Sequence, residues 1–178
     1  MYRQPVRLSF YGLFALLAVA AYLVHEAGHW LVGAALGYPV SFGINSVISG
    51  TPMTQDDHIL MSAAGPAVTV LIALAAFVMV MRRRSLAAYG ILYFAMFMRA
   101  IAAGVSLFNA NDEARISMLM GWGQWTLPAL VVIPLLVLTI IASRKLRLSW
   151  KVNAILYVLA SIVATVVVGL DMVLRSTI

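Results

Sequence analysis

The chain has 178 residues, of which 63% are hydrophobic and 10% are charged, and its mean hydropathy is +1.00. Soluble domains are about half apolar and about a quarter charged, so this composition excludes an ordinary soluble domain and predicts an integral membrane protein. The absence of cysteine excludes disulfides and thiolate metal sites, and the net charge of +6 lacks the interleaved aromatic residues of a nucleic-acid surface, so no nucleic-acid partner is expected.

Five apolar segments are long enough to cross a membrane, which takes about 20 residues. The first follows two arginines, as in a signal peptide, but its apolar run exceeds the ~7–15 residues of a signal core, so we expect an uncleaved span. We predict an all-α integral membrane protein, with 1–178 as one membrane-embedded domain. Its motif-bearing core is 8–118, and 125–174 adds two further spans. The predicted spans are 8–36, 59–81, 86–108, 125–142 and 152–174.

Most lysines and arginines fall on one side of these spans. Positively charged flanks mark the cytoplasmic side, so the N-terminus is predicted to be cytoplasmic and Asp112 to lie outside. We expect the protein to reside in the cytoplasmic membrane of a prokaryote. The basic residues on the predicted cytoplasmic side are Arg3, Arg7, Arg82, Arg83, Arg84, Arg144, Lys145, Arg147 and Lys151.

The first span contains the segment HEAGH, in which ionisable side chains interrupt an apolar run. On a helix, His25 and His29 lie one turn apart on the same face, so they can bind one metal ion together. Glu26 lies beside that face, where it can act as a general base. An ionisable side chain at the centre of a span costs about 2.5–3.5 kcal/mol on insertion scales, which favours a functional role. We therefore predict a Zn²⁺ cofactor held by the two imidazoles, with Glu26 as the catalytic residue.

The connection 38–52, which follows the first span, has a different pattern. Apolar residues alternate with others from position 40 to position 44, and Gly43 and Gly50 interrupt the run. This pattern predicts one short strand or a hairpin. It lies either on the surface or in a re-entrant position beside the first span.

A catalytic zinc site needs a third protein ligand. Asp112 and Glu113 follow the third span at about the predicted depth of the two histidines, as a shared metal requires. Asp56 and Asp57, which precede the second span, are further candidates. Asp171, late in the fifth span, lies toward the same side, so depth alone does not exclude it.

Polar residues in and after the third span each have two interpretations. Arg99 either forms an ion pair inside the bundle, which we favour because intramembrane charges usually pair, or contacts a substrate carbonyl. Asn109 and Asn111 either donate hydrogen bonds to the substrate backbone or an oxyanion, or cap a helix that begins near Asp112.

Three segments together, HEAGH, AAGPAVT and FNANDEARI, resemble the site-2 protease family of intramembrane zinc metalloproteases. The resemblance implies that Asp112 is the third zinc ligand and that Arg115 is the basic residue that often follows it. Gly65 and Pro66 match the second motif of the family. Thr69 stands where that motif has asparagine.

In the third motif the chain lacks the family's proline and has Glu113 where glycine is expected. Glu113 therefore stays a rival ligand, and either Asn109 or Asn111 is the family asparagine. The family also has a β-element after the first motif, which binds substrate as an added strand. This implies that Phe42 and Gly43 contact substrate.

The expected function is hydrolysis of peptide bonds in membrane-protein substrates, in or near the lipid bilayer. The expected partner is a transmembrane segment that must partly unwind, because helical carbonyls are hydrogen-bonded and shielded. The alternative is a catalytically impaired, metal-binding regulatory membrane protein, a pseudoprotease, which the incomplete second and third motifs favour. The intact Glu26 favours the enzyme.

Overall fold

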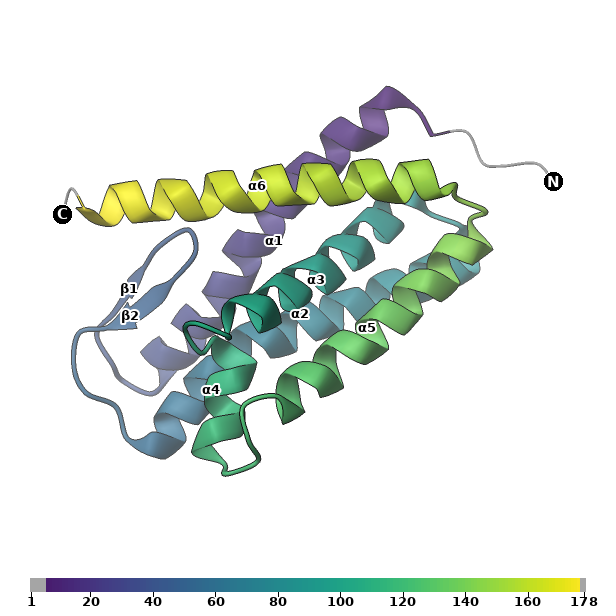
Figure 1. Cartoon of the computed structure of the whole chain (residues 1–178). Helices are drawn as coiled ribbons and strands as arrows, with labels where there is room; N and C mark the ends of the chain where they lie inside the picture. Colours follow the sequence, from purple (N-terminus) through teal and green to yellow (C-terminus); the bar gives the residue numbers. More distant parts are fainter. Residues whose placement is uncertain (1–5, 177–178) are drawn as a thin grey trace.

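The computed structural model describes residues 6–176, so Arg3, which contributed to the predicted orientation, lies outside the described residues. Within 6–176 the chain forms six helices and one two-stranded antiparallel sheet (Figure 1). The elements are α1 (Leu8–Ala35), β1 (Val40–Phe42), β2 (Val47–Ser49), α2 (Gln55–Arg83), α3 (Leu86–Val105), α4 (Asp112–Leu119), α5 (Thr126–Lys145) and α6 (Trp150–Ser176).

Five of these helices, α1, α2, α3, α5 and α6, are long and apolar enough to cross a membrane. They coincide with the five predicted spans, with shifts of a few residues at the ends. Helix α2 begins before its apolar run because the Thr54 hydroxyl accepts a hydrogen bond from the Asp57 N–H and caps the first turn. Helix α3 ends at Val105 rather than at position 108, and the chain then turns into α4.

The segment 38–52 forms a hairpin. Residues Val40, Ser41 and Phe42 pair with Ser49, Ile48 and Val47, respectively. The turn is closed by a hydrogen bond of 2.8 Å from the Gly43 N–H to the Ser46 carbonyl. The hairpin packs against α1, so it is held beside the helix that carries HEAGH.

Helix α3 lies at the centre of the bundle, in contact with α1, α2, α5 and α6. Its contact with α1 is aromatic: Phe94 packs edge-to-face against Phe14, with ring centroids 6.1 Å apart, and against Tyr22, at 5.7 Å. Both Phe14 and Phe94 are fully buried. Rings of this size contribute much of the buried apolar area of a small bundle and hold α1 and α3 in a defined register.

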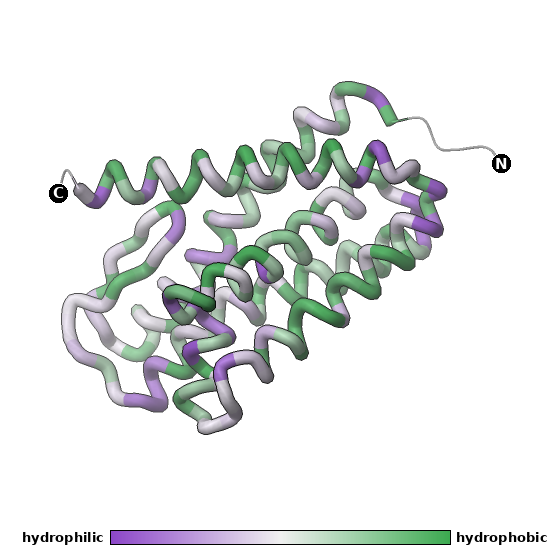
Figure 2. The backbone as a smooth tube through the Cα atoms, viewed as in Figure 1, coloured by the Kyte–Doolittle hydropathy of each residue, from purple (hydrophilic) through white to green (hydrophobic). Residues whose placement is uncertain are grey.

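The two ends of the bundle differ. The α2–α3 and α5–α6 connections, with Arg82–Arg84 and Arg144–Lys151, lie at one end, and the hairpin and α4 lie at the other (Figure 1). Hydrophilic residues gather at both ends, with apolar helix between them (Figure 2). The alternating helix direction thus places the residues of HEAGH and of the α4 start toward the end opposite the basic connections.

Candidate metal centre

The site begins with an unusually close approach of α1 and α2. A Cβ atom on Gly28 would lie 3.0 Å from the Ala64 carbonyl oxygen of α2. A Cβ atom on Gly65 would overlap both imidazoles, at 2.6 Å from Cε1 of His25 and 2.8 Å from Cδ2 of His29. Two glycines, one on each helix, therefore let the backbone of α2 lie directly against the two rings.

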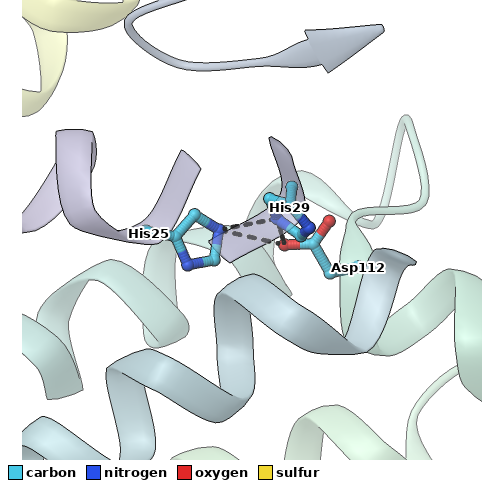
Figure 3. A group of neighbouring side chains, drawn as sticks. All are labelled: His25, His29 and Asp112. Atoms are coloured by element: carbon cyan, nitrogen blue, oxygen red, sulfur yellow. Dashed lines mark hydrogen bonds and ion pairs between the residues drawn. The ribbon is translucent and has the colours of Figure 1, made fainter. Parts of the chain in front are cut away.

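Three side chains converge at this crossing, two from α1 and one from the first residue of α4 (Figure 3). The Nε2 atoms of His25 and His29 are 3.2 Å apart, and Oδ2 of Asp112 lies 3.2 Å from the first and 3.5 Å from the second. Zinc bonds of about 2.0–2.1 Å in tetrahedral directions place ligand atoms about 3.3 Å apart. The three atoms thus already have the spacing of one face of a zinc tetrahedron.

The other ring nitrogens fix the tautomer of both histidines. Nδ1 of His29 lies 2.7 Å from the Met61 carbonyl oxygen, which can only accept, so Nδ1 carries the hydrogen. Nδ1 of His25 lies 3.0 Å from the Thr69 hydroxyl, which already donates to the Gly65 carbonyl and is left to accept. Both Nε2 atoms therefore direct a lone pair into the site.

The two Nε2 atoms and the carboxylate of Asp112 thus face one another at hydrogen-bond distance. Burial raises the pKa of the Asp112 carboxyl, but the two histidine side chains beside it lower this pKa more, and it lies well below its usual range. Asp112 is thus an anion. A divalent metal would take the place of the hydrogens shared among these atoms, and two imidazoles and a carboxylate are ligands of the kind that zinc binds.

Glu26 follows His25 on α1 and lines the same cavity, which has a volume of about 800 Å³. Its side chain is buried, with 5% of the residue exposed. Among the described residues, the Glu26 carboxylate takes part in no hydrogen bond or ion pair. The carboxylate is therefore available to a group that enters the cavity.

The structure separates the rival ligand Glu113 from the histidines. Although it follows Asp112 directly, its two carboxylate oxygens lie 3.1 and 3.2 Å from Nη1 of Arg99 on α3. Successive residues of a helix point about 100° apart, so only one of the two acidic side chains reaches the imidazoles. The ion pair expected for Arg99 is present.

Asp171 has a different role. Its carboxylate accepts hydrogen bonds from the Ser46 hydroxyl at 2.7 Å and the Asn45 N–H at 3.3 Å, both in the hairpin turn. Nε of Arg175, one turn further along α6, lies 2.9 Å away. Asp171 thus ties α6 to the hairpin and lies outside the group formed by His25, His29 and Asp112.

Both asparagines line the cavity. Asn111 occupies the residue before α4 but makes no side-chain capping bond. Its Nδ2 donates instead to the Ala102 carbonyl on α3, at 3.0 Å, and so fixes the approach of the chain to Asp112.

The hairpin residues predicted to contact substrate, Phe42 and Gly43, do not line the cavity. The hairpin wall of the cavity is formed by the turn residues Asn45 and Ser46 and by strand β2. Phe42 is 48% exposed. The resemblance pointed to the hairpin as a whole, and which strand faces the site depends on how the hairpin packs on α1.

Two contacts of the site had no usable sequence signal. The Met61 carbonyl is a backbone group that any residue would supply, and Thr69 was recognised only as a departure from a family motif. Arg115, which that motif also suggested, lies with Nη1 4.0 Å from Oδ1 of Asp112. No family model, curated protein or solved structure matches this chain.

Proposed function

We propose that this chain is a zinc metalloendopeptidase of the site-2 protease type, which hydrolyses membrane-protein substrates in or near the bilayer. The observation that carries the proposal is the convergence of His25 Nε2, His29 Nε2 and Asp112 Oδ2 to within 3.5 Å, beside Glu26. A structural metal site needs no such carboxylate. A catalytic one needs three protein ligands and a base.

In this proposal the five long helices span the cytoplasmic membrane of a prokaryote. The basic connections at one end of the bundle lie in the cytoplasm, together with the N-terminus. The HEAGH segment then lies toward the outer side. The apolar side chains exposed along α1, α5 and α6 support the membrane-spanning position of these helices, because such a surface is suited to lipid and not to water.

Bound zinc would lower the pKa of water and polarise a carbonyl group. Glu26 takes a proton from the attacking water, whose oxygen bonds to the carbonyl carbon. The C–N bond then breaks, and Glu26 passes the proton to the leaving amine. Thr69 and Met61 hold the hydrogen of each neutral imidazole on Nδ1, which leaves Nε2 free, and such partners tune the affinity of a metal site.

The proposed substrate is a transmembrane segment that has partly unwound. Strand β2 is suited to hold it. Hydrogen bonds join Gly43 to Ser46 and Gly50 to Pro39. Hydrogen-bonded and non-hydrogen-bonded pairs alternate along an antiparallel ladder, so the N–H and C=O groups of Val47 and Ser49 point away from β1. Both residues line the cavity, and an extended chain paired with them would lie along its wall.

The first prediction tests the role of Glu26. Glu26→Gln keeps the shape of the side chain but removes its basicity, so the variant is expected to bind one zinc as the wild type does and to lose cleavage by at least about 100-fold. The measurements are zinc content by mass spectrometry and cleavage of fluorescein-labelled casein, an unstructured substrate that needs no unwinding. His25→Ala is the matched control, expected to lose both zinc and activity.

Full activity of Glu26→Gln would contradict the mechanism. A wild type that binds zinc but cleaves neither casein nor co-expressed single-span proteins would favour the metal-binding regulatory alternative. A wild type that binds no zinc would contradict both.

A further inference from the structure

Arg99 is a buried cation inside a helix that is otherwise apolar. It lies on α3, 4% exposed, and lines the cavity together with Glu26 and Asp112. A guanidinium group stays charged at every accessible pH and is expensive to bury. In this position beside the candidate metal ligands, each nitrogen of Arg99 therefore needs a partner.

Nη1 is fully used. It lies 3.1 and 3.2 Å from the two oxygens of Glu113 and 3.4 Å from Oδ2 of Asp112. The pair with Glu113 cancels the charge of the guanidinium.

The other nitrogens are not satisfied in the same way. Nη2 lies 3.4 Å from Nε2 of His25, whose lone pair is the one that faces the metal position. Nε is buried and has no hydrogen-bond partner among the described residues. Metal binding uses the lone pair of His25, so it leaves Nη2 without its acceptor. A buried arginine with two unpaired donors at a metal site is suited to an anionic oxygen.

We propose that Arg99 is a catalytic residue that donates hydrogen bonds to the oxyanion formed on the scissile carbonyl. This inference rests on the proposed peptidase function and assigns it one more residue. As the carbonyl carbon takes up the oxygen of water, the C=O electron pair moves onto the carbonyl oxygen, and the preorganised guanidinium stabilises that charge. Glu113 positions Arg99 and does not contact the substrate.

The test is binding and not turnover. Two probes are titrated into the zinc-loaded protein by calorimetry: N-phosphoryl-leucinamide, whose phosphoryl oxygens mimic the oxyanion, and N-acetylcysteamine, a thiol with no anionic oxygen. Arg99→Gln is expected to lower the affinity for the phosphoramidate about 10- to 100-fold. The affinity for the thiol and the zinc content should not change. Glu113→Gln, which keeps the guanidinium, is expected to keep most of the phosphoramidate affinity.

Arg99→Gln leaves Glu113 as an unpaired buried charge, so the double variant Arg99→Gln/Glu113→Gln guards against misfolding. It should show the same selective loss as the single variant. Equal losses for both probes, or a loss in Glu113→Gln as large as that in Arg99→Gln, would assign Arg99 to structure only and overturn the inference. If the wild type binds zinc and Glu26→Gln is inactive, the peptidase proposal would stand even when the role of Arg99 is overturned. Absence of zinc would overturn both the peptidase proposal and the role of Arg99.

Discussion

The hydroxyl group of Thr69 connects a helix backbone to a candidate metal ligand. It donates to the Gly65 carbonyl one turn earlier, at 3.0 Å, and accepts from Nδ1 of His25, also at 3.0 Å. The hydroxyl has a single hydrogen and the Gly65 carbonyl can only accept, so the hydroxyl must accept from Nδ1 of His25. Thr69 therefore fixes the tautomer of His25, and the ring cannot turn without losing a buried hydrogen bond.

Removal of this hydroxyl is predicted to weaken metal binding without unfolding the protein. Thr69→Val keeps the shape and removes the acceptor, and zinc affinity should fall about 10- to 100-fold, as for other partners of metal-bound histidines. Thr69→Ser should retain most of the affinity. The measurement is zinc competition against a fluorescent chelator.

Thr139 on α5 offers a matched control for this substitution. It is buried like Thr69, and its hydroxyl donates to the Leu135 carbonyl one turn earlier, but it is not among the residues that line the cavity. Thr139→Val should leave zinc affinity unchanged. An equal loss in the two valine variants would point to a general effect on the helices and would refute the role given to Thr69.

Local spacing explains which site residues could be predicted. His25, Glu26 and His29 lie within five positions of one helix, so helical geometry alone places the histidines on one face. The choice between Asp112 and Glu113 could not be made in this way, because it depends on how α4 turns toward α1 and on which acidic residue pairs with Arg99. Both depend on the tertiary structure and not on local sequence.

At the scale of elements, the site depends on how closely α1 and α2 cross. Gly28 and Gly65 remove the side chains that would otherwise separate the two backbones, and small residues are the usual means by which membrane helices approach. The imidazoles occupy the space that a side chain at position 65 would fill. The crossing therefore sets the position of the ligands as well as the packing of the helices.

Gly65→Ala is predicted to damage this crossing. The added methyl group overlaps both imidazoles, so the rings or the helices must move, at a cost of about 1–3 kcal/mol in the free energy of unfolding. Zinc should no longer bind stoichiometrically. The measurements are zinc content and the midpoint of thermal unfolding in detergent.

Gly12→Ala on α1 is the matched control, because a Cβ there meets no atom within 4 Å. Alanine favours a helix over glycine by about 0.5–1 kcal/mol, so this variant should be as stable as the wild type or more so, with full zinc content. If Gly65→Ala had the zinc content and thermal stability of Gly12→Ala, α1 and α2 would have to lie further apart at position 65 than they do in this structure.

The long helices were predictable because each needs only one continuous apolar run. Of the two structures predicted for 38–52, one short strand or a hairpin, the hairpin is the one that forms, and alternation and glycine are the local signals that predicted it. Its attachment was not predictable: Asp171 and Arg175 of α6 hold the turn at Ser46, across 125 positions of sequence. The local sequence of neither segment predicts a contact with the other.

At the scale of the whole molecule, charge and chemistry separate to opposite ends. The basic connections around Arg82–Arg84 and Arg144–Lys151 lie at one end of the bundle, and the candidate metal centre lies toward the other (Figure 1). If basic loops stay in the cytoplasm, the cavity of the proposed peptidase would receive its substrate from the outer half of the bilayer. Under that proposal, orientation decides which side of a membrane protein is cleaved.

The sequence contains no cysteine, so a single introduced cysteine reports on one position without background. Thr51 is exposed beside the hairpin, and Lys151 is exposed at the start of α6, at the basic end. With a membrane-impermeant maleimide on intact cells, Thr51→Cys is expected to be labelled at once and Lys151→Cys only after permeabilisation. The reverse pattern would place the metal centre toward the cytoplasm and show that the charge distribution does not set the orientation of this bundle. The two variants serve as controls for each other, because labelling of both without permeabilisation would show that the membrane is leaky.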